Sequence, residues 1–491
     1  MLFGEWQLFR RPLVPFALST KPLHAPVWLL LAVFLSGCGL PPRGPTRRQS
    51  PPPSESYAKS LERTGLAKRA VGQRWLAAAR AAVEEAAVIA VPHREVVGFQ
   101  ELTPDARGWR VNLKRGQKLL VRLEGQSGRG QTFVDVLAVY GSGRQGYTLK
   151  SAESGTETST KTALDFTFEA RRDGDYVVRV QPEIFASGVW SLSLSIAPSY
   201  AFPVEGHDHD AVKSFFGAPR DRGKRRHHGV DIFADRGTPV LAVVDGEIFH
   251  RGVDNLGGNV LWQWDPDRRL RIYYAHLEGW AVRRGEKVEQ GEVIGWVGNT
   301  GNAITTPPHL HFGVFDPRPL DPFPFIDDQV RPEPQLALGP LRLWSWARVR
   351  PKQIELQDRL GPGALVRRLL PRHTALAVIS SLPGGHQVEL PDGERGYLSS
   401  AALEPAASAL RWIEAGPLRI YERPNPGVVP TSTLTRTIAG VRGEHEGHFL
   451  IALGEQLVWV KAEEVALMRT PTNKRPGVRA APSRVPTPGQ G

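Results

Sequence analysis

An alternation of apolar and polar residues with a period of two constrains the fold of this chain more than any other feature. It recurs between residues 98 and 198, where Trp109, Val111 and Leu113 alternate with polar or charged neighbours. Successive side chains of a strand point to opposite faces of a sheet, so this period predicts half-buried strands. The 491 residues include 50 glycines and 42 prolines, which favours many turns and short strands. We therefore expect a mainly β protein with several domains.

The alternating region predicts a β-sandwich over residues 98–200, and it loosely resembles the jelly-roll modules that accompany secreted bacterial peptidases. Upstream, residues 57–97 are expected to form a helical segment. The stretch "QRWLAAARAAVEEAAVIAV" is rich in alanine and contains neither glycine nor proline, and it stops at Pro92.

Cys38 is the only cysteine, so the chain cannot form an intramolecular disulfide. Basic residues and then an apolar run from Val27 to Leu35 precede it, which is the layout of a secretory signal. The run is short for a membrane span. "LSGC" at 35–38 resembles the bacterial lipobox, which implies cleavage before Cys38 and lipidation of its thiol. An ordinary signal peptide with an incidental cysteine is the alternative.

Residues 1–37 are accordingly expected to be a lipoprotein signal peptide, and the Pro-rich residues 38–56 an extended tether. The expected location is the cell envelope, with the chain anchored by its lipid. Gly39 is not an acidic retention signal, so in a Gram-negative cell we expect the outer membrane, facing the periplasm. The net charge of +12 favours anionic lipid or cell-wall polymer as a partner, or serves only solubility. Export argues against nucleic acid.

A weak internal repeat occurs in the C-terminal part of the chain. "RGYLSSAALEP" at 395–405 corresponds to "LVWVKAEEVAL" at 457–467. The pair resembles tandem bacterial SH3-like barrels, small β-barrels that commonly target the cell wall, here at 338–405 and 408–468. General barrel packing explains the same residues, so a binding role stays open. The tail at 469–491 is expected to be disordered.

A pair of histidines in "PPHLHFGVF" is the sharpest sign of chemistry. Residues i and i+2 of a strand face the same way, so His309 and His311 project together from a strand that is otherwise apolar. A catalytic zinc needs about three protein ligands and one open position, and imidazole and carboxylate both suit it.

A second candidate for a metal site is "KRRHHGVDIF", where two histidines precede an aspartate. On an extended segment residues four apart share a face, so His227 would pair with Asp231 and His228 would point elsewhere, lining the cleft. A helix would bring both histidines within reach of Asp231. Irregular backbone at 227–229 would also weaken the distinction.

Five motifs occur in the order "HHGVD", "GTPVLAVVDGEI", "YYAHLEGWAV", "GEKVEQGEVIGWVGNTGN" and "PHLHFGV". Together they resemble the lysostaphin-type (LytM-like) zinc metalloendopeptidases of peptidoglycan, over roughly residues 212–316. The resemblance implies an antiparallel β-sheet peptidase domain (a duplicated hybrid motif) at 205–326 that binds one zinc ion. The metal ligands that it implies are His227, Asp231 and His311, and the catalytic histidines are His309 and His276. No expected ligand is replaced, which favours an active enzyme.

The sequence departs from the resemblance at one point. Some relatives carry a tyrosine shortly before the first ligand that helps to stabilise the oxyanion, and here no tyrosine lies between Tyr200 and Tyr273. His276 and Arg220 are the nearest candidates for that role. Asn259, next to two glycines, is a candidate for contacting the substrate backbone.

Two polar stretches near the predicted cleft have competing interpretations. "PRDRGKRRHH" at 219–228 is strongly basic, and it is either a solvated loop or a docking site for the carboxylates of stem peptides. "GHDHD" at 206–210 has the residue types of a divalent metal site, but it lacks a second half, so a solvated loop is favoured.

These residues predict an endopeptidase that hydrolyses peptide cross-links of peptidoglycan in cell-wall remodelling. Zinc lowers the pKa of a bound water to about 7 and polarises the scissile carbonyl. His309 or His276 would remove a proton and return one to the leaving amine. Two alternatives stay open. One is a non-hydrolytic wall-binding protein or activator of a wall amidase, with the amidase or a division complex as its partner, and the other is a secreted zinc protease that acts on proteins.

Overall fold

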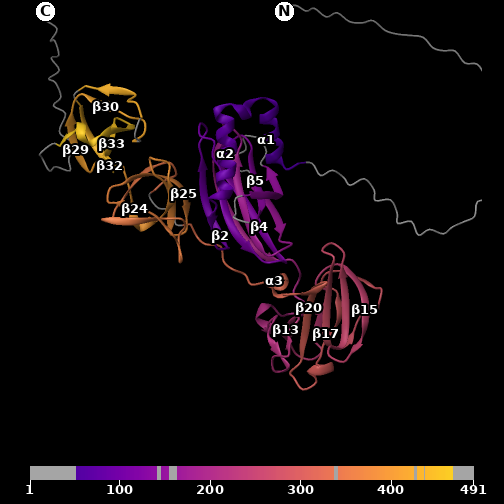
Figure 1. Ribbon diagram of the computed structural model, residues 1–491. Coiled ribbons are helices and arrows are strands. Elements are labelled where there is room, and N and C mark those ends of the chain that lie inside the picture. The colour runs from indigo at the N-terminus through magenta and orange to yellow at the C-terminus, as the bar shows by residue number, and fades with distance from the viewer. Residues whose placement is uncertain are drawn as a thin grey trace, which may run out of the picture. The chain divides into compact units, whose positions relative to one another are not determined.

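The computed structural model describes residues 51–140, 145–153, 163–336, 341–424, 428–435 and 437–467. The expected signal peptide with Cys38, most of the expected tether and the tail at 469–491 lie outside these residues. Among the residues that are described, no helix has both the length and the apolar character needed to cross a bilayer. The prediction of a mainly β protein is confirmed (Figure 1).

Two helices begin the described chain, α1 (Pro53–Arg63) and α2 (Ala70–Glu84). α1 starts inside the stretch expected to be an extended tether, with a proline in its first turn, where the missing N–H costs nothing. Gly65 has φ 77° and separates the helices, so the helical segment expected over 57–97 is interrupted. It also ends at Glu84, because His93–Phe99 forms strand β2.

The helices contact strands of a β-sandwich. One sheet has the order β1-β3-β8-β5-β6, and the facing layer contains β2-β9-β4-β7. Trp109, Val111 and Leu113 on β3 are almost fully buried and pack against strands of the other layer, which is the consequence of their period-two spacing. The strands are β1 (Ala87–Val88), β2 (His93–Phe99), β3 (Arg107–Leu113), β4 (Gln117–Arg129), β5 (Thr132–Tyr140), β6 (Gln145–Glu153), β7 (Ala163–Glu169), β8 (Gly174–Pro182) and β9 (Ser187–Pro198).

A second, antiparallel sheet carries the histidine motifs, with the order β10-β13-β20-β17-β16-β15-β18 and with β14, β19 and β21 paired beside it. Its apolar face is completely buried and includes Val230, Ile232, Leu310 and Phe312. The elements are β10 (Val212–Ser214), β13 (Val230–Phe233), β14 (Pro239–Leu241), β15 (Gly246–Asp254), β16 (Gly258–Asp265), β17 (Leu270–Trp280), β18 (Lys287–Val288), β19 (Val293–Val297), β20 (His309–Asp316), β21 (Arg318–Leu320) and α3 (Phe323–Ile326). A separate hairpin consists of β11 (Pro219–Arg220) and β12 (Arg225–Arg226).

The C-terminal strands form two antiparallel groups, each with its own apolar core. The first group continues one layer of the sandwich, because its strand Ala375–Leu382 pairs with β2. The first contains β22 (Trp346–Val349), β23 (Gln353–Gln357), β24 (Val366–Pro371), β25 (Ala375–Leu382), β26 (Gly385–Glu389), β27 (Arg395–Ser399) and β28 (Leu403–Pro405). The second contains β29 (Arg411–Ala415), β30 (Leu418–Ile420), β31 (Ser432–Leu434), β32 (Thr437–His445), β33 (His448–Leu453), β34 (Gln456–Lys461) and β35 (Ala466–Leu467).

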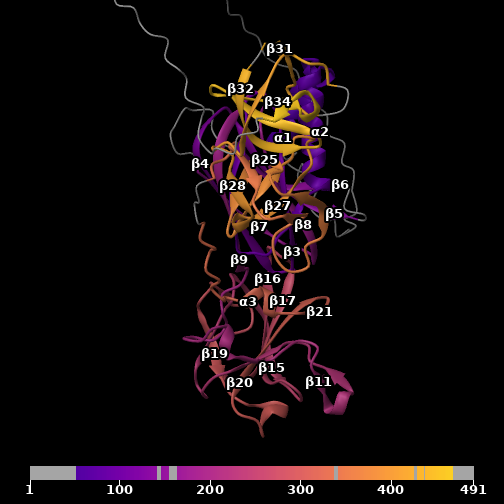
Figure 2. The same cartoon turned by 90° about the vertical axis from the view of Figure 1, so that its left-hand side faces the viewer.

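The two copies of the sequence repeat have the same local structure. Each forms a strand, a short 3₁₀ turn and a second short strand, namely β27 to β28 in the first copy and β34 to β35 in the second. The closed barrels expected at 338–405 and 408–468 are not found in the described residues. The edge strands β24 and β28 do not pair with one another, nor do β34 and β35, so both strand orders are open. Figure 2 shows the strands of both groups from a second side.

Candidate active site

The strand register brings two of the predicted metal ligands together. Asp231 on β13 lies directly opposite His311 on β20, and on the other side of His311 lies Ala275 of β17. Directly opposed residues of an antiparallel pair project from the same face of the sheet. Asp231 Oδ1 is accordingly 3.0 Å from His311 Nδ1.

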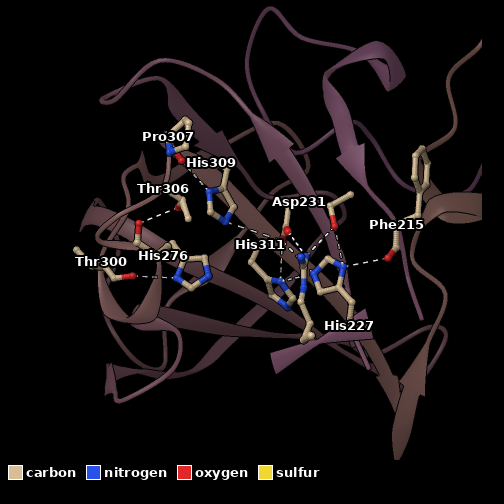
Figure 3. Close-up of polar contacts among 12 residues, drawn as sticks. Phe215, His227, Asp231, His276, Thr300, Thr306, Pro307, His309 and His311 are labelled. Carbon is tan, nitrogen blue, oxygen red and sulfur yellow. Dashed lines mark hydrogen bonds and ion pairs between the residues drawn. The ribbon is translucent and has the colours of Figure 1, made fainter. Parts of the chain in front are cut away.

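His227 reaches this pair from an irregular segment before β13. Its Nε2 lies 3.0 Å from Asp231 Oδ1 and 3.0 Å from His311 Nδ1 (Figure 3). Its backbone N–H donates to the carbonyl of Ala218, which fixes the segment from the other side. His227 is therefore the histidine beside Asp231, as the spacing predicted, although residues 227–229 are not a strand. His228 is exposed and lines the cavity outside this three-residue group.

Gly229 permits the close approach of these segments. A Cβ at this position would lie 2.4 Å from the carbonyl oxygen of Phe312 and 2.8 Å from the ring of His311. Both contacts are too short for a real side chain, and the Phe312 oxygen belongs to the backbone of β20. Only glycine therefore allows the chain to turn from His227 into β13 at this distance from His311.

The hydrogen bonds around the three ligands indicate that a cation fits between them. His227 Nδ1 lies 3.0 Å from the carbonyl of Phe215, which can only accept, so Nδ1 carries the ring proton. The lone pair on Nε2 then faces the carboxylate of Asp231. Burial lowers the pKa of His311, which keeps its ring neutral, the form that binds a metal. Two imidazole nitrogens and a carboxylate that converge in this way suit zinc.

The two predicted catalytic histidines have the same orientation. His309 Nδ1 lies 2.9 Å from the carbonyl of Pro307, and His276 Nδ1 lies 2.9 Å from the carbonyl of Thr300 (Figure 3). Because a carbonyl only accepts, each Nδ1 holds a proton and each Nε2 is left with a lone pair. Both residues line the cavity that contains the predicted metal ligands.

The distances place His309 nearer to the ligands than His276. His309 Nε2 is 4.0 Å from Asp231 Oδ1. The ring centroid of His276 lies 5.0 Å from that of His309 and 5.9 Å from that of His311. Burial, with smaller contributions from the neighbouring His311 and His309, lowers the pKa of His276 to about 4. His276 is therefore neutral near neutral pH.

The backbone of His276 is held in an unusual conformation. Its φ is 63°, in the left-handed region that residues with a Cβ seldom adopt. Its N–H donates to the carbonyl of Gly257 over 2.7 Å, so the loop before β16 fixes the backbone while Thr300 fixes the ring. Backbone strain of this kind persists where the surrounding structure holds it, often at functional sites.

The structure gives the two predicted substrate-binding residues different positions. Arg220 lines the cavity and donates to Asp231 and, over 2.7 Å, to Ser214 Oγ. Asn259 does not line the cavity. Its side-chain amide donates to the carbonyls of Leu277 and Glu278, at 3.0 and 3.2 Å, so it links β16 to β17 and has no N–H left for a substrate.

Sequence reasoning missed three aromatic residues of the cavity, Phe233, Tyr273 and Phe315. Phe233 stacks on His309 with 5.0 Å between ring centroids and lies opposite it in the β13–β20 register. Tyr273 lies 5.9 Å from the His311 ring, and its hydroxyl donates to Asp254 over 3.0 Å. The signal was available, because Phe233 follows Asp231 by two residues and therefore shares its face.

The stretch "GHDHD" does not assemble a metal site. His209 pairs with Asp328 over 3.0 Å, and Asp208 accepts from the backbone of Asp210. Another group, Asp392 with His445 and Glu446, does gather among the residues that the structure describes. There, however, Arg368 contacts both carboxylates and supplies the positive charge.

One family model matches the part of the chain that carries the histidine motifs. The model of peptidase family M23 matches residues 225–322, which contain all five predicted metal and catalytic residues. Over 106 residues the chain is 41% identical to the glycyl-glycine endopeptidase ALE-1 of Staphylococcus capitis, covering 20% of this chain and 29% of that protein. Over 140 residues it is 35% identical to an L-Ala–D-Glu endopeptidase of Bacillus subtilis, covering 26% and 43%.

A further relative is the peptidoglycan DD-endopeptidase ShyC of Vibrio cholerae, which is 36% identical over 88 residues, or 18% of this chain and 20% of that protein. Among solved structures, the catalytic domain of lysostaphin from Staphylococcus simulans matches with 35% identity and a TM-score of 0.22, over 24% of this chain and 92% of that one. The chain spans less than half the length of each of these curated relatives.

Proposed function

We propose that this chain is a zinc-dependent endopeptidase that hydrolyses peptide bonds of peptidoglycan. The observation that carries the proposal is the convergence of His227, Asp231 and His311 beside two histidines whose Nε2 atoms are left unprotonated. Support comes from the match to peptidase family M23 and from relatives that are named as endopeptidases. Those relatives are named for three different peptide bonds, so the proposal extends to the substrate class and not to one bond.

The protein side of the mechanism follows from the positions of the side chains. A zinc ion held by His227, Asp231 and His311 would supply a Lewis acid and a water of lowered pKa. We assign the general base to His309, because its Nε2 lies 4.0 Å from Asp231 Oδ1 and its Nδ1 proton is held by Pro307. As the base, His309 would take a proton from the attacking water at Nε2. The resulting imidazolium can return this proton to the leaving amine nitrogen.

The oxyanion needs a donor, and the ring orientation separates the two candidates. In neutral His276 the only ring N–H is directed at Thr300, so Nε2 can accept but not donate. Arg220 always carries its protons and lies on the cavity wall beside Asp231. A guanidinium has five N–H groups, so Arg220 can retain its contact with Asp231 and still donate to a substrate oxygen.

We also propose an envelope location for the chain. The lipobox-like "LSGC" supports lipidation of Cys38, and the open C-terminal sheets are proposed to be SH3-like wall-binding modules, supported by their shared strand–turn–strand repeat. Fractionation of cells that express the Cys38→Ser variant tests the anchor. The unmodified chain should sediment with membranes and the variant should not.

Incubation of the zinc-loaded protein with isolated sacculi, with and without a chelator, tests the proposed hydrolysis. New amine and carboxyl ends should appear only in the sample without chelator, and mass spectrometry of the released fragments would name the bond. If neither sample contains new ends, hydrolysis is refuted and the wall-binding or amidase-activating alternative is favoured.

A further inference from the structure

The walls of the active-site cavity differ in charge. Four permanently basic residues line it, and among the side chains that the structure describes the only acidic one that lines it is that of the proposed metal ligand Asp231. All four lie on β10 and the β11–β12 hairpin, and they are Lys213, Arg220, Arg225 and Arg226. We call these four residues the basic wall.

The other side of the cavity carries no charge. It is formed by residues of the loops before β16 and before β20, which contribute small, apolar or amide side chains. Those residues are Leu256, Gly257, Asn302, Ala303 and Thr306. A substrate in this cavity would therefore meet positive charge on one flank only.

The basic wall is tied to the metal ligands by the backbone. Ser214, next to Lys213, lies opposite Asp231 in the β10–β13 register. Arg226 directly precedes His227, and its partner in the hairpin is Pro219. The backbone hydrogen bonds that position Asp231 and His227 therefore also fix the backbone from which Lys213 and Arg226 project.

Lys213 and Arg226 retain their charge for a ligand. Both side chains are exposed, and neither forms an ion pair with any carboxylate whose side chain the structure describes. The Arg226 guanidinium donates a 3.2 Å hydrogen bond to the carbonyl of Gly217. A carbonyl leaves the charge uncompensated, and a bound divalent cation would outweigh the single carboxylate of Asp231. The cavity as a whole is therefore electropositive.

From this we propose that the cleft selects peptides with a free carboxylate close to the scissile bond, and that Lys213 and Arg226 bind this carboxylate. The inference rests on the proposed peptidase function and narrows its substrate class. A neutral glycine bridge would gain nothing from the basic wall, whereas the carboxylate of a stem peptide would. That carboxylate belongs either to an acidic side chain or to the C-terminus of the peptide, and amidating each one separately distinguishes them.

The test compares matched peptides with the zinc-loaded full chain. One peptide has both carboxylates free, one has the side-chain carboxylate amidated, and one has the C-terminal carboxylate amidated. We expect kcat/KM to fall for one of the amidated peptides. The preference is the ratio of kcat/KM for the free peptide to kcat/KM for the amidated one. In the Lys213→Gln, Arg226→Gln double variant this ratio should fall by about threefold for each removed cation, because exposed ion pairs are individually weak.

Lys224→Gln is the matched control. Lys224 lies on the same hairpin, is exposed and does not line the cavity, so its replacement removes one charge and should leave the preference unchanged. Raised salt should reduce the preference of the unmodified chain, since salt screens exposed charges. This second measurement holds even if the double variant folds poorly.

The two proposals fail in different ways. Equal kcat/KM for all three peptides, with sacculi still cut, overturns the basic wall as a selector and leaves the peptidase standing. If sacculi are not cut, the peptidase proposal fails, and fluorescence anisotropy of the labelled peptides on the same protein then decides the selection. Equal affinities would overturn it, and tighter binding of the carboxylate peptide would support it.

Discussion

At the scale of single residues, the site depends on where each imidazole keeps its proton. The carbonyls of Phe215, Pro307 and Thr300 each accept from an Nδ1–H of a different histidine. None of these carbonyls is recognisable from the residue types, because any residue can supply one. They nevertheless decide that three Nε2 atoms face the cavity with lone pairs.

Replacement of His311 by alanine should remove both zinc and hydrolysis. Two ligands remain, which is fewer than the three protein ligands of ordinary catalytic zinc sites, so affinity should fall by more than about 100-fold. Metal analysis and digestion of sacculi measure the two losses. His228→Ala is the control. His228 is outside the group of predicted ligands, so this variant should keep its zinc and most of its activity. Stoichiometric zinc in His311→Ala would contradict the ligand assignment.

Gly229→Ala should disturb the site although it removes no functional group. The new methyl would meet the Phe312 carbonyl and the His311 ring, and such overpacking typically costs about 1–3 kcal/mol. We expect a lower free energy of unfolding, measured in urea, together with weaker zinc binding. Gly279→Ala is the matched control, because its Cβ would lie 3.7 Å from Trp296 in ordinary contact. Equal stability of the two variants would disprove the steric role.

At the scale of elements, sequence predicts what one strand determines by itself. His309 and His311 share a face because they are two residues apart, and this needs no partner. The pairing of Asp231 with His311 is different, since it is set by the register between β13 and β20. The helix break at Gly65 and the edges that leave the C-terminal sheets open likewise depend on backbone conformation and strand partners that are distant in sequence.

Asn259 shows that the sequence around a residue does not reveal its hydrogen-bond partners. Its place between glycines and a strand predicted a contact with substrate, but its amide joins two carbonyls near the end of β17. Asn259→Ala should therefore lower stability by about 1 kcal/mol per lost hydrogen bond while kcat/KM stays within a factor of about two. Urea unfolding and peptide hydrolysis separate the effects. A large loss of kcat/KM with unchanged stability would restore the substrate-binding role.

At the scale of the whole molecule, parts with separate apolar cores should differ in how much a bound metal stabilises them against unfolding. The sheet with the histidine motifs, the β-sandwich and the two C-terminal groups each bury a distinct apolar cluster. Multidomain chains of this kind do not unfold in one two-state step. Ligand that binds only the folded form stabilises the part that contains its site.

Removal of zinc should therefore lower the melting temperature of one calorimetric transition and leave the others in place. At roughly 1,000 times its Kd a ligand stabilises by about 4 kcal/mol, enough to separate the transitions with and without chelator. The His311→Ala chain is the control, and its transitions should not respond to zinc. A uniform shift of every transition would mean that the cores are coupled.

Because Asp231 and His311 are paired across two strands, metal binding also depends on the correct register between β13 and β20. A slip of one residue between β13 and β20 would turn one of these side chains to the opposite face of the sheet. The slipped strand would also turn its apolar residues away from the core, so such a chain would be less stable and would present the ion with an incomplete set of donors. Zinc content in a purified sample therefore reports the fraction of molecules whose strands are correctly aligned, before any substrate is added.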